Sequence, residues 1–173
     1  MNETMKTILT RRSIRAYLPK QISEAELDTV LEAGTYAASA MNQQSCLFVV
    51  LQQGVHLDRL YELGSVLRGG GNPFYGAPTV VLVCAKKGNA VPYADACVAM
   101  DNLMLAAASI DLGSCWINCV VDIFAGADGT AFAKQLGIPD GYGVMASCAL
   151  GYRAGPNPEA PPRKEGFVLR PKA

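Results

Sequence analysis

Residues 93–110 form an apolar stretch that dictates the centre of any fold this chain can adopt. They include the run ACVAMDNLMLAAASI, which has a helical pattern with apolar side chains on almost every face. Such a helix must be buried, either inside a domain or in a contact between subunits. We do not expect it to span a membrane, because Asp95, Asp101 and Asn102 interrupt it and each central Asp would cost about 2.5 to 3.5 kcal/mol in lipid.

Helix and strand patterns alternate along the rest of the chain. Ser23 and Glu26 have the spacing of a capping box, and apolar residues with a helical period follow them. The chain is proline-rich from Arg153 onward, which predicts no regular element there. At 173 residues, half of them apolar, we expect one domain over residues 1–173. The other predicted elements are a short N-terminal helix, strands at residues 45–52, 78–85, 113–120 and 141–151, and helices at residues 56–68 and 129–136.

The charges balance overall but are distributed unevenly. Fifteen basic and fifteen acidic residues leave no net field that would draw the chain to nucleic acid or to an anionic membrane. Ten of the fifteen basic residues lie within the first 20 or the last 21 positions, Lys172 among them. The N-terminus has no apolar run or cleavage site typical of a secretory signal, so we expect a cytoplasmic protein.

The cysteines and the single histidine argue against several kinds of site. All six cysteines stand in apolar surroundings, where cysteine behaves as a small, reduced core residue. Cys115 and Cys119 have no second ligand pair nearby, so the sequence predicts no metal site. His56 lies on a predicted surface helix, which gives a Ser-His-Asp triad no support. We therefore expect Cys46 and Cys115 to contribute to packing.

Three arginines and a serine fall within five residues near the N-terminus. Arg11, Arg12 and Arg15 can be interpreted as a solvated helix end, where cations are favourable. They can equally bind phosphate through guanidinium forks, with Ser13 adding a hydroxyl donor. The segment GGGN, which begins at Gly69, has neither the spacing nor the context of a nucleotide-binding fingerprint. The arginine-rich segment is therefore the better candidate for binding an anion.

The same segment opens a resemblance that covers essentially the whole chain. RRSIRAYLPKQISEAELDTVLEAG and AASAMNQQSCLFVV resemble the first motifs of the nitroreductase family of FMN-dependent oxidoreductases. GAPTVVLVCA, SIDLGSCWINCV, QLGIPDGYGVMASCALGYRAG and PPRKEGFV follow in the order that the family shows. The resemblance implies an α+β, nitroreductase-like fold with a central, mostly antiparallel sheet flanked by helices. It also implies an intertwined homodimer with its flavin sites at the subunit interface.

The resemblance further implies which residues contact FMN. The first motif would hold the phosphate, the ribityl chain and the pyrimidine edge, and the second would reach the flavin from the partner subunit. The third passes the flavin N5 and O4 edge with its backbone, Asn118 near N5, and the fourth returns two basic residues to the phosphate. In motif order these residues are Arg11, Arg12, Ser13 and Arg15; Ser39, Asn42 and Gln44; Trp116, Ile117 and Asn118; Arg163 and Lys164.

The chain departs from the family pattern on one side of the expected site. Ala38 stands where proline is usual, and Ser45, Cys46 and Leu47 replace the common Pro-Trp-His. These changes remove a large aromatic side chain and alter the expected shape of the substrate side. The segment between Arg68 and the next predicted strand is short, so we expect no long lid.

The implied activity needs no catalytic side chain from the protein. The flavin carries the reaction, and the protein supplies binding, orientation and electrostatics, such as a cation at Arg15. The resemblance implies an FMN oxidoreductase that takes hydride from NAD(P)H and reduces a nitroaromatic or a quinone by a ping-pong mechanism. The alternatives are a specialised enzyme of the same fold, which consumes reduced flavin or dehalogenates an aromatic, and a flavin-binding sensor without acceptor chemistry.

Overall fold

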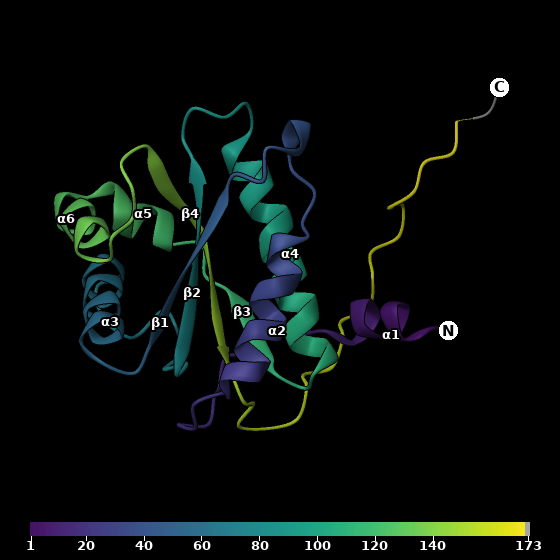
Figure 1. Cartoon of the computed structure of the whole chain (residues 1–173). Helices are drawn as coiled ribbons and strands as arrows, with labels where there is room; N and C mark the ends of the chain where they lie inside the picture. The colour runs from purple at the N-terminus through teal and green to yellow at the C-terminus, as the bar shows by residue number, and fades with distance from the viewer. Residues whose placement is uncertain (172–173) are drawn as a thin grey trace.

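The computed structural model describes residues 1–171, and one four-stranded sheet forms its centre (Figure 1). The strands pair in the order β1-β2-β4-β3, and every neighbouring pair is antiparallel. The mostly antiparallel sheet that the family resemblance implied is therefore confirmed. Lys172 and the last position of the expected domain lie outside the described residues. The strands are β1 (Cys46–Gln52), β2 (Thr79–Lys86), β3 (Gly113–Trp116) and β4 (Tyr142–Gly151).

The long apolar helix is central to the fold, as its sequence predicts. It is α4 (Pro92–Ser109), which contacts strands β2 and β4 and also α2 (Glu24–Thr35) on one side of the sheet (Figure 1). Gly34 permits this close packing, because a Cβ there would lie 2.7 Å from Leu103 Cδ2 and 2.9 Å from Phe48 Cζ. The buried residues of α4 are Asp95, Ala96, Ala99, Met100, Leu103, Met104 and Ala107.

Three shorter helices cover the opposite side of the sheet: α3 (Val55–Arg68), α5 (Val120–Ala125) and α6 (Ala127–Gln135) (Figure 1). Strand β2 contributes side chains to the apolar clusters on both sides of the sheet, since successive side chains of a strand point to opposite faces. Its Val81 and Val83 belong to the apolar cluster with α2 and α4, whereas Val80, Leu82 and Cys84 belong to the cluster with α3, α5 and α6. This explains why β2 is an uninterrupted apolar run rather than an alternating one.

One predicted strand is shorter than its sequence suggests. We predicted a strand over residues 113–120, but β3 ends at Trp116 and the helix α5 begins at Val120. Residues 120–125, VVDIFA, are rich in β-branched and aromatic side chains, which favour a strand locally. As a helix, they bury Val120 and Ile123 against the cluster of α3 and α6. Tertiary packing therefore outweighed the local preference.

Both ends of the chain lie apart from this core. The N-terminal helix α1 (Glu3–Thr10) has no buried residue and exposes Met5, Ile8 and Leu9. The C-terminal tail extends away from the sheet without a regular element (Figure 1), as the prolines predict. Within residues 1–171, no helix combines the length and the hydropathy needed to span a bilayer.

Candidate functional site

The arginine-rich segment lies along the start of strand β3. Arg11 ends α1 by donating its backbone N–H to the carbonyl oxygen of Thr7 at 2.9 Å. The chain then forms a parallel bridge between Ser13 and Ser114, and the N–H of Ile14 donates to the carbonyl of Ser114 at 2.9 Å. Backbone pairing therefore fixes the segment against a strand that comes from much later in the sequence.

This pairing gathers Arg11, Ser13 and Arg15 around the thiol of Cys115, and we call these three residues the cationic cluster. Burial raises the pKa of Cys115, while the charge of Arg15, a hydrogen bond with Ser13 and the charge of Arg11 lower it. Among residues 1–171, no carboxylate lies within 4.0 Å of either arginine of the cluster as a salt-bridge partner. The cluster therefore offers two uncompensated guanidinium groups and a hydroxyl to an anion.

Arg12 lies next to the cationic cluster but is engaged elsewhere. Its Nη1 donates to the carbonyl oxygens of Leu9 at 3.0 Å and Arg11 at 2.5 Å. A guanidinium on the last carbonyls of a helix is favourable, because these groups carry the negative end of the helix dipole. The structure therefore gives the Arg12 side chain a role at the end of α1 and does not bring it into the cluster.

The predicted segment Trp116, Ile117 and Asn118 continues from the cationic cluster where β3 leaves the sheet. Ile117 is fixed on both sides, because its N–H donates to the carbonyl of Ser147 at 2.8 Å and its own carbonyl accepts the Ser147 hydroxyl at 2.9 Å. The Tyr93 hydroxyl donates to Oδ1 of Asn118 at 3.4 Å. The Trp116 ring packs against the α2 and α4 cluster, and its buried Nε1 has no hydrogen-bond partner among the described residues.

The second predicted motif lies on a tight connection between α2 and β1, residues 39–45, which we call the 39–45 loop. It contains the short 3₁₀ helix η1 (Ala40–Asn42) and three non-glycine residues with positive φ: Met41 at 53°, Asn42 at 52° and Gln44 at 47°. The Ser39 hydroxyl accepts the N–H of Gln44 at 2.9 Å, and Nε2 of Gln44 donates to Oδ1 of Asn42 at 3.4 Å. Asn42 and Gln44 are both exposed.

The 39–45 loop and the cationic cluster are separate within one chain. Among residues 1–171, no hydrogen bond or salt bridge joins the loop to Arg11, Ser13 or Arg15. The loop instead contacts α4, where the carboxylate of Asp95 accepts hydrogen bonds from Ala40 and from the Ser45 hydroxyl. Asp95 is not among the predicted site residues, although an acid on a buried apolar helix is a signal for one.

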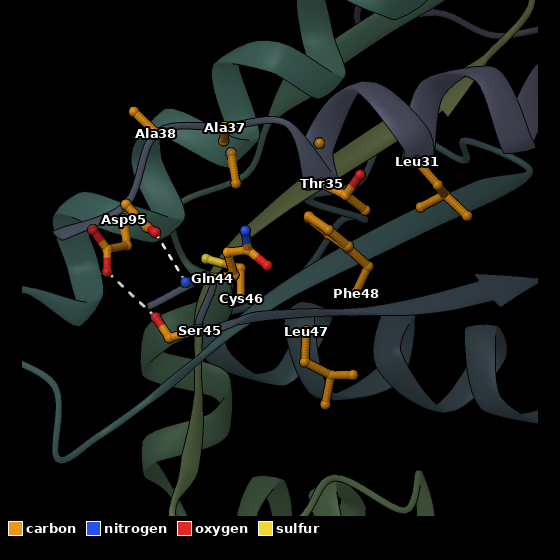
Figure 2. Close-up of a pocket in the computed structure, with 13 residues that line it drawn as sticks. Leu31, Thr35, Ala37, Ala38, Gln44, Ser45, Cys46, Leu47, Phe48 and Asp95 are labelled. Carbon is orange, nitrogen blue, oxygen red and sulfur yellow. Dashed lines mark hydrogen bonds between the residues drawn. The ribbon is translucent and has the colours of Figure 1, made fainter. Parts of the chain in front are cut away.

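A cavity of about 450 Å³ lies between α2, the 39–45 loop and the start of β1 (Figure 2). Its walls include Leu31 and Phe48, together with the polar groups of Gln44 and Asp95. Burial, followed by the charge of Asp95, raises the pKa of the adjacent Cys46 thiol. The positions where the sequence departs from the family pattern all line this cavity: Ala38, Ser45, Cys46 and Leu47.

The C-terminal tail begins beside the arginine-rich segment but does not return its basic residues there. The N–H of Ala154 donates to the carbonyl of Ala16 at 3.0 Å, and Nδ2 of Asn157 donates to that of Thr10 at 3.0 Å. Farther along, residues 155–171 are exposed. The tail runs away from the sheet (Figure 1), and no salt bridge among residues 1–171 involves Arg163 or Lys164.

The core role that the sequence predicts for the six cysteines holds for three of them, whereas Cys46, Cys97 and Cys119 are partly exposed. All six are free, and Cys84, Cys115 and Cys148 are buried. Burial raises the pKa of Cys84 and of Cys148 to about 12, so both remain protonated thiols at neutral pH. His56 is exposed on α3. Within the described part of the chain, no three His, Cys, Asp or Glu side chains gather as the ligands of a metal ion.

Together these features describe an α+β domain with a helix-covered antiparallel sheet and, beside the edge strand β3, two arginines without a carboxylate partner in residues 1–171. The sequence model of the Nitroreductase family matches residues 8–67 and 65–152. The chain therefore belongs to the nitroreductase family.

Individual relatives resemble this chain in sequence and in structure. A protein of Archaeoglobus fulgidus, provisionally named NADH dehydrogenase/NAD(P)H nitroreductase, is 32% identical over 88% of this chain and 86% of its own length. A crystal structure of a nitroreductase with bound FMN from Bacteroides fragilis is 33% identical, covers 99% of this chain and 100% of the other, and has a TM-score of 0.92. A nitroreductase with bound FMN from Desulfitobacterium hafniense is 27% identical with the same coverage and a TM-score of 0.88.

Proposed function

We propose that this protein is an FMN-dependent oxidoreductase that oxidises NAD(P)H and reduces a small acceptor, a nitroaromatic or a quinone, with both substrates using one pocket in turn. Similar proteins support the cofactor and the electron donor, since two similar structures hold FMN and the Archaeoglobus fulgidus relative is named as an NAD(P)H nitroreductase. Bound FMN supplies the electron-transfer chemistry, and the chain's residues bind and orient the reactants.

The observation that carries this proposal is the uncompensated charge of the cationic cluster. Two guanidinium groups and a hydroxyl around one buried thiol, without a carboxylate partner in residues 1–171, match the needs of a phosphate group. Arg11 and Ser13 would hold the phosphate and the ribityl chain, and Arg15 would place a positive charge near the pyrimidine edge. A cation there stabilises the negative charge that the flavin gains on reduction.

The other predicted residues would complete the flavin site in this proposal. The backbone of Trp116, Ile117 and Asn118 leaves β3 beside the cluster, and the bonds of Ile117 to Ser147 make it rigid enough to orient a flat ring. Arg12 would support the cluster from the end of α1. Arg163 and Lys164 would reach the phosphate only if the tail takes another path in the assembled protein.

We also propose that residues 1–173 form one domain that assembles as a homodimer. The 39–45 loop is separate from the cationic cluster in one chain, so its Ser39, Asn42 and Gln44 would reach the flavin of the other subunit. A groove of about 350 Å³ between α1 and α4 is lined by Ile8 and Leu105, among other apolar and polar residues, and Met5 and Leu9 of α1 are also exposed. An apolar surface of this kind is suited to a second copy of the chain. A molar mass of one chain in light scattering would contradict this assembly.

One observation favours a second candidate, a specialised flavin enzyme of the same fold. The four departures from the family motif all line the cavity of about 450 Å³, so this chain has its own shape on the side where an acceptor would enter (Figure 2). Such an enzyme would consume reduced flavin or dehalogenate an aromatic instead of reducing nitro compounds. A flavin sensor is the remaining alternative.

The experiment that tests the proposal is an absorption spectrum of the purified protein, followed by anaerobic addition of NADH or NADPH. We expect flavin bands that bleach with either donor and recover when a nitroaromatic or a quinone is added. Bands that bleach but recover only with another acceptor would favour the specialised enzyme, and bands that no donor bleaches would favour the sensor. A colourless protein that takes up no FMN would refute the proposal.

A further inference from the structure

Asp95 is a buried carboxylate that joins the two ends of the 39–45 loop to helix α4. Only 4% of the residue is exposed, although it lies in the first turn of the helix. One carboxylate oxygen accepts the backbone N–H of Ala40 at 2.9 Å, where the loop begins. The other accepts the hydroxyl of Ser45 at 3.3 Å, where the loop passes into β1 (Figure 2). A single side chain therefore fixes both ends of the loop.

The backbone between these two ends is strained. Met41, Asn42 and Gln44 have φ values of 53°, 52° and 47°, in the left-handed region. Asparagine tolerates this region, so Met41 and Gln44 carry the strain. Strain of this kind persists only when surrounding contacts impose it, and it is concentrated at functional sites. The Ser39 hydroxyl supplies one such contact inside the loop, through the N–H of Gln44. Asp95 supplies the contacts from outside the loop.

The burial of this charge is not explained by stability alone. Among residues 1–171, no lysine or arginine forms a salt bridge with Asp95, so the carboxylate has no opposite charge to compensate its loss of water. The helix dipole favours an acid in the first turn of a helix, but Asp128 has that position on α6 and is exposed. What distinguishes Asp95 from Asp128 is its pair of hydrogen bonds to the loop.

We propose that Asp95 is a positioning residue for FMN, because it holds the 39–45 loop in the one conformation that presents Asn42 and Gln44 to the cofactor. This inference rests on the proposed function, and Asp95 itself does not touch the flavin. The loop would otherwise relax to ordinary backbone angles, and its side chains would then have to be reordered on binding. Preorganisation of this kind improves affinity by removing the ordering cost from the binding step.

The first test compares FMN affinity among variants that differ in the hydrogen bonds they retain. Asp95→Ala removes both bonds and is expected to weaken FMN binding about 10- to 100-fold. Ser45→Ala removes one bond and should give a smaller loss. Asp95→Asn keeps an oxygen for the Ala40 N–H and an amide donor for the Ser45 oxygen, so we expect binding within about 3-fold of the wild type. Asp128→Ala, the matched acid in the first turn of α6, should change nothing.

The second test asks whether Asp95 acts through the loop or through general stability. Asn42→Ala should weaken FMN binding in the wild type but have little further effect in an Asp95→Ala background, because the loop is already released. In the absence of FMN, the amides of residues 39–45 should exchange hydrogen faster in Asp95→Ala than in the wild type. Purely additive effects of Asn42→Ala and Asp95→Ala would mean that Asp95 does not act through this loop.

The outcomes separate this inference from the proposed function. A wild-type protein that binds no FMN refutes the proposed function, and the positioning role with it. A wild type that binds FMN while Asp95→Ala binds it equally well refutes only the positioning role. Asp95→Asn that binds as weakly as Asp95→Ala also refutes it, because the hydrogen bonds would then not be the cause. If Asp95→Ala does not fold, Asp95→Asn and Ser45→Ala decide the question, and unchanged binding in Ser45→Ala contradicts the inference.

Discussion

The guanidinium carbon of Arg15 lies 5.9 Å from the centre of the Tyr75 ring, so an aromatic face supports one cation of the cationic cluster. A side-chain hydrogen bond with Tyr75 is the main cause that raises the pKa of Arg15. Tyr75 lies in the short glycine-rich connection before β2 and has a φ of 58°. Tyr75 is not among the residues that the sequence predicts for the site, because nothing in the local pattern indicates that the connection reaches the N-terminal segment.

The Arg15–Tyr75 contact predicts a modest effect on cofactor affinity. Tyr75→Ala should weaken FMN binding about 2- to 5-fold, because an exposed cation–π contact contributes about 0.5 to 1 kcal/mol. Tyr75→Phe retains the ring but loses the hydroxyl that bonds to Arg15, so its affinity should lie between those of Tyr75→Ala and the wild type. Titration followed by flavin fluorescence measures both variants, and equal affinity in all three proteins would show that Tyr75 does not orient Arg15.

Substitutions in the cationic cluster should weaken FMN binding more strongly. Arg11→Ala and Arg15→Ala should each cost about 1.5 to 3 kcal/mol of FMN binding free energy, since each removes a charge-assisted hydrogen bond to phosphate or flavin. The double variant need not show the sum, because the two groups share one ligand. Arg59→Ala, which removes a surface pair with Glu62 on α3, is the control and should bind FMN normally. Unchanged affinity in both cluster variants would mean that the cluster is only a solvated helix end.

The carboxylate of Glu26 should stabilise the fold to an extent that depends on pH. Its Oε2 accepts the Ser23 N–H at 2.8 Å, the Ser23 hydroxyl at 2.7 Å and the Tyr152 hydroxyl at 2.7 Å, so the predicted capping box is confirmed. The Ser23 hydroxyl and then Tyr152 lower the pKa of Glu26 below its ordinary value of 4.5. A lowered pKa stabilises the fold fully above the ordinary value, and this stabilisation is lost as the pH falls through the folded value.

Glu26→Gln should therefore lower the free energy of unfolding by about 0.5 to 1 kcal/mol at neutral pH, a value that allows for solvent screening at an exposed cap. The difference from the wild type should shrink as the pH falls below 4.5, because the wild-type carboxylate becomes protonated too. Urea unfolding at several pH values measures this. Glu32→Gln, at an exposed position later in the same helix, should show no such trend. A difference for Glu26→Gln that does not change with pH would contradict the assignment.

The close approach of α5 and α6 predicts a strong packing effect at Gly129. A Cβ at this position would lie 1.9 Å from the carbonyl oxygen of Ile123 and 2.7 Å from Cα of Phe124, which are backbone atoms that cannot rotate away. Gly129→Ala should destabilise the protein by about 2 kcal/mol or more, despite the better helix propensity of alanine. Gly88→Ala, where nothing lies within 4 Å, is the control. Equal denaturation midpoints for the two variants would show that the helices separate easily.

Much of the fold follows from local patterns in the sequence. The spacing of Ser23 and Glu26 predicted the start of α2, and the apolar run of residues 93–110 predicted a central buried helix. Both signals are local, since a cap and a helical period depend on residues a few positions apart. The end of β3 at Trp116 could not be predicted in this way, because residues 120–125 favour a strand locally and become a helix only through burial against α3 and α6.

The order of the family motifs can be recognised from the residues alone, and it indicates Arg11, Ser13 and Arg15 as flavin-binding candidates. Which of these residues come together depends on the folded chain. The bridge from Ser13 to Ser114 gathers the cationic cluster, whereas the side chain of Arg12 turns to the end of α1. Likewise, the sequence does not indicate that the 39–45 loop is strained or that it donates two hydrogen bonds to Asp95. The physical reason is that these contacts join segments far apart along the chain, and their geometry exists only once the sheet and α4 have packed together.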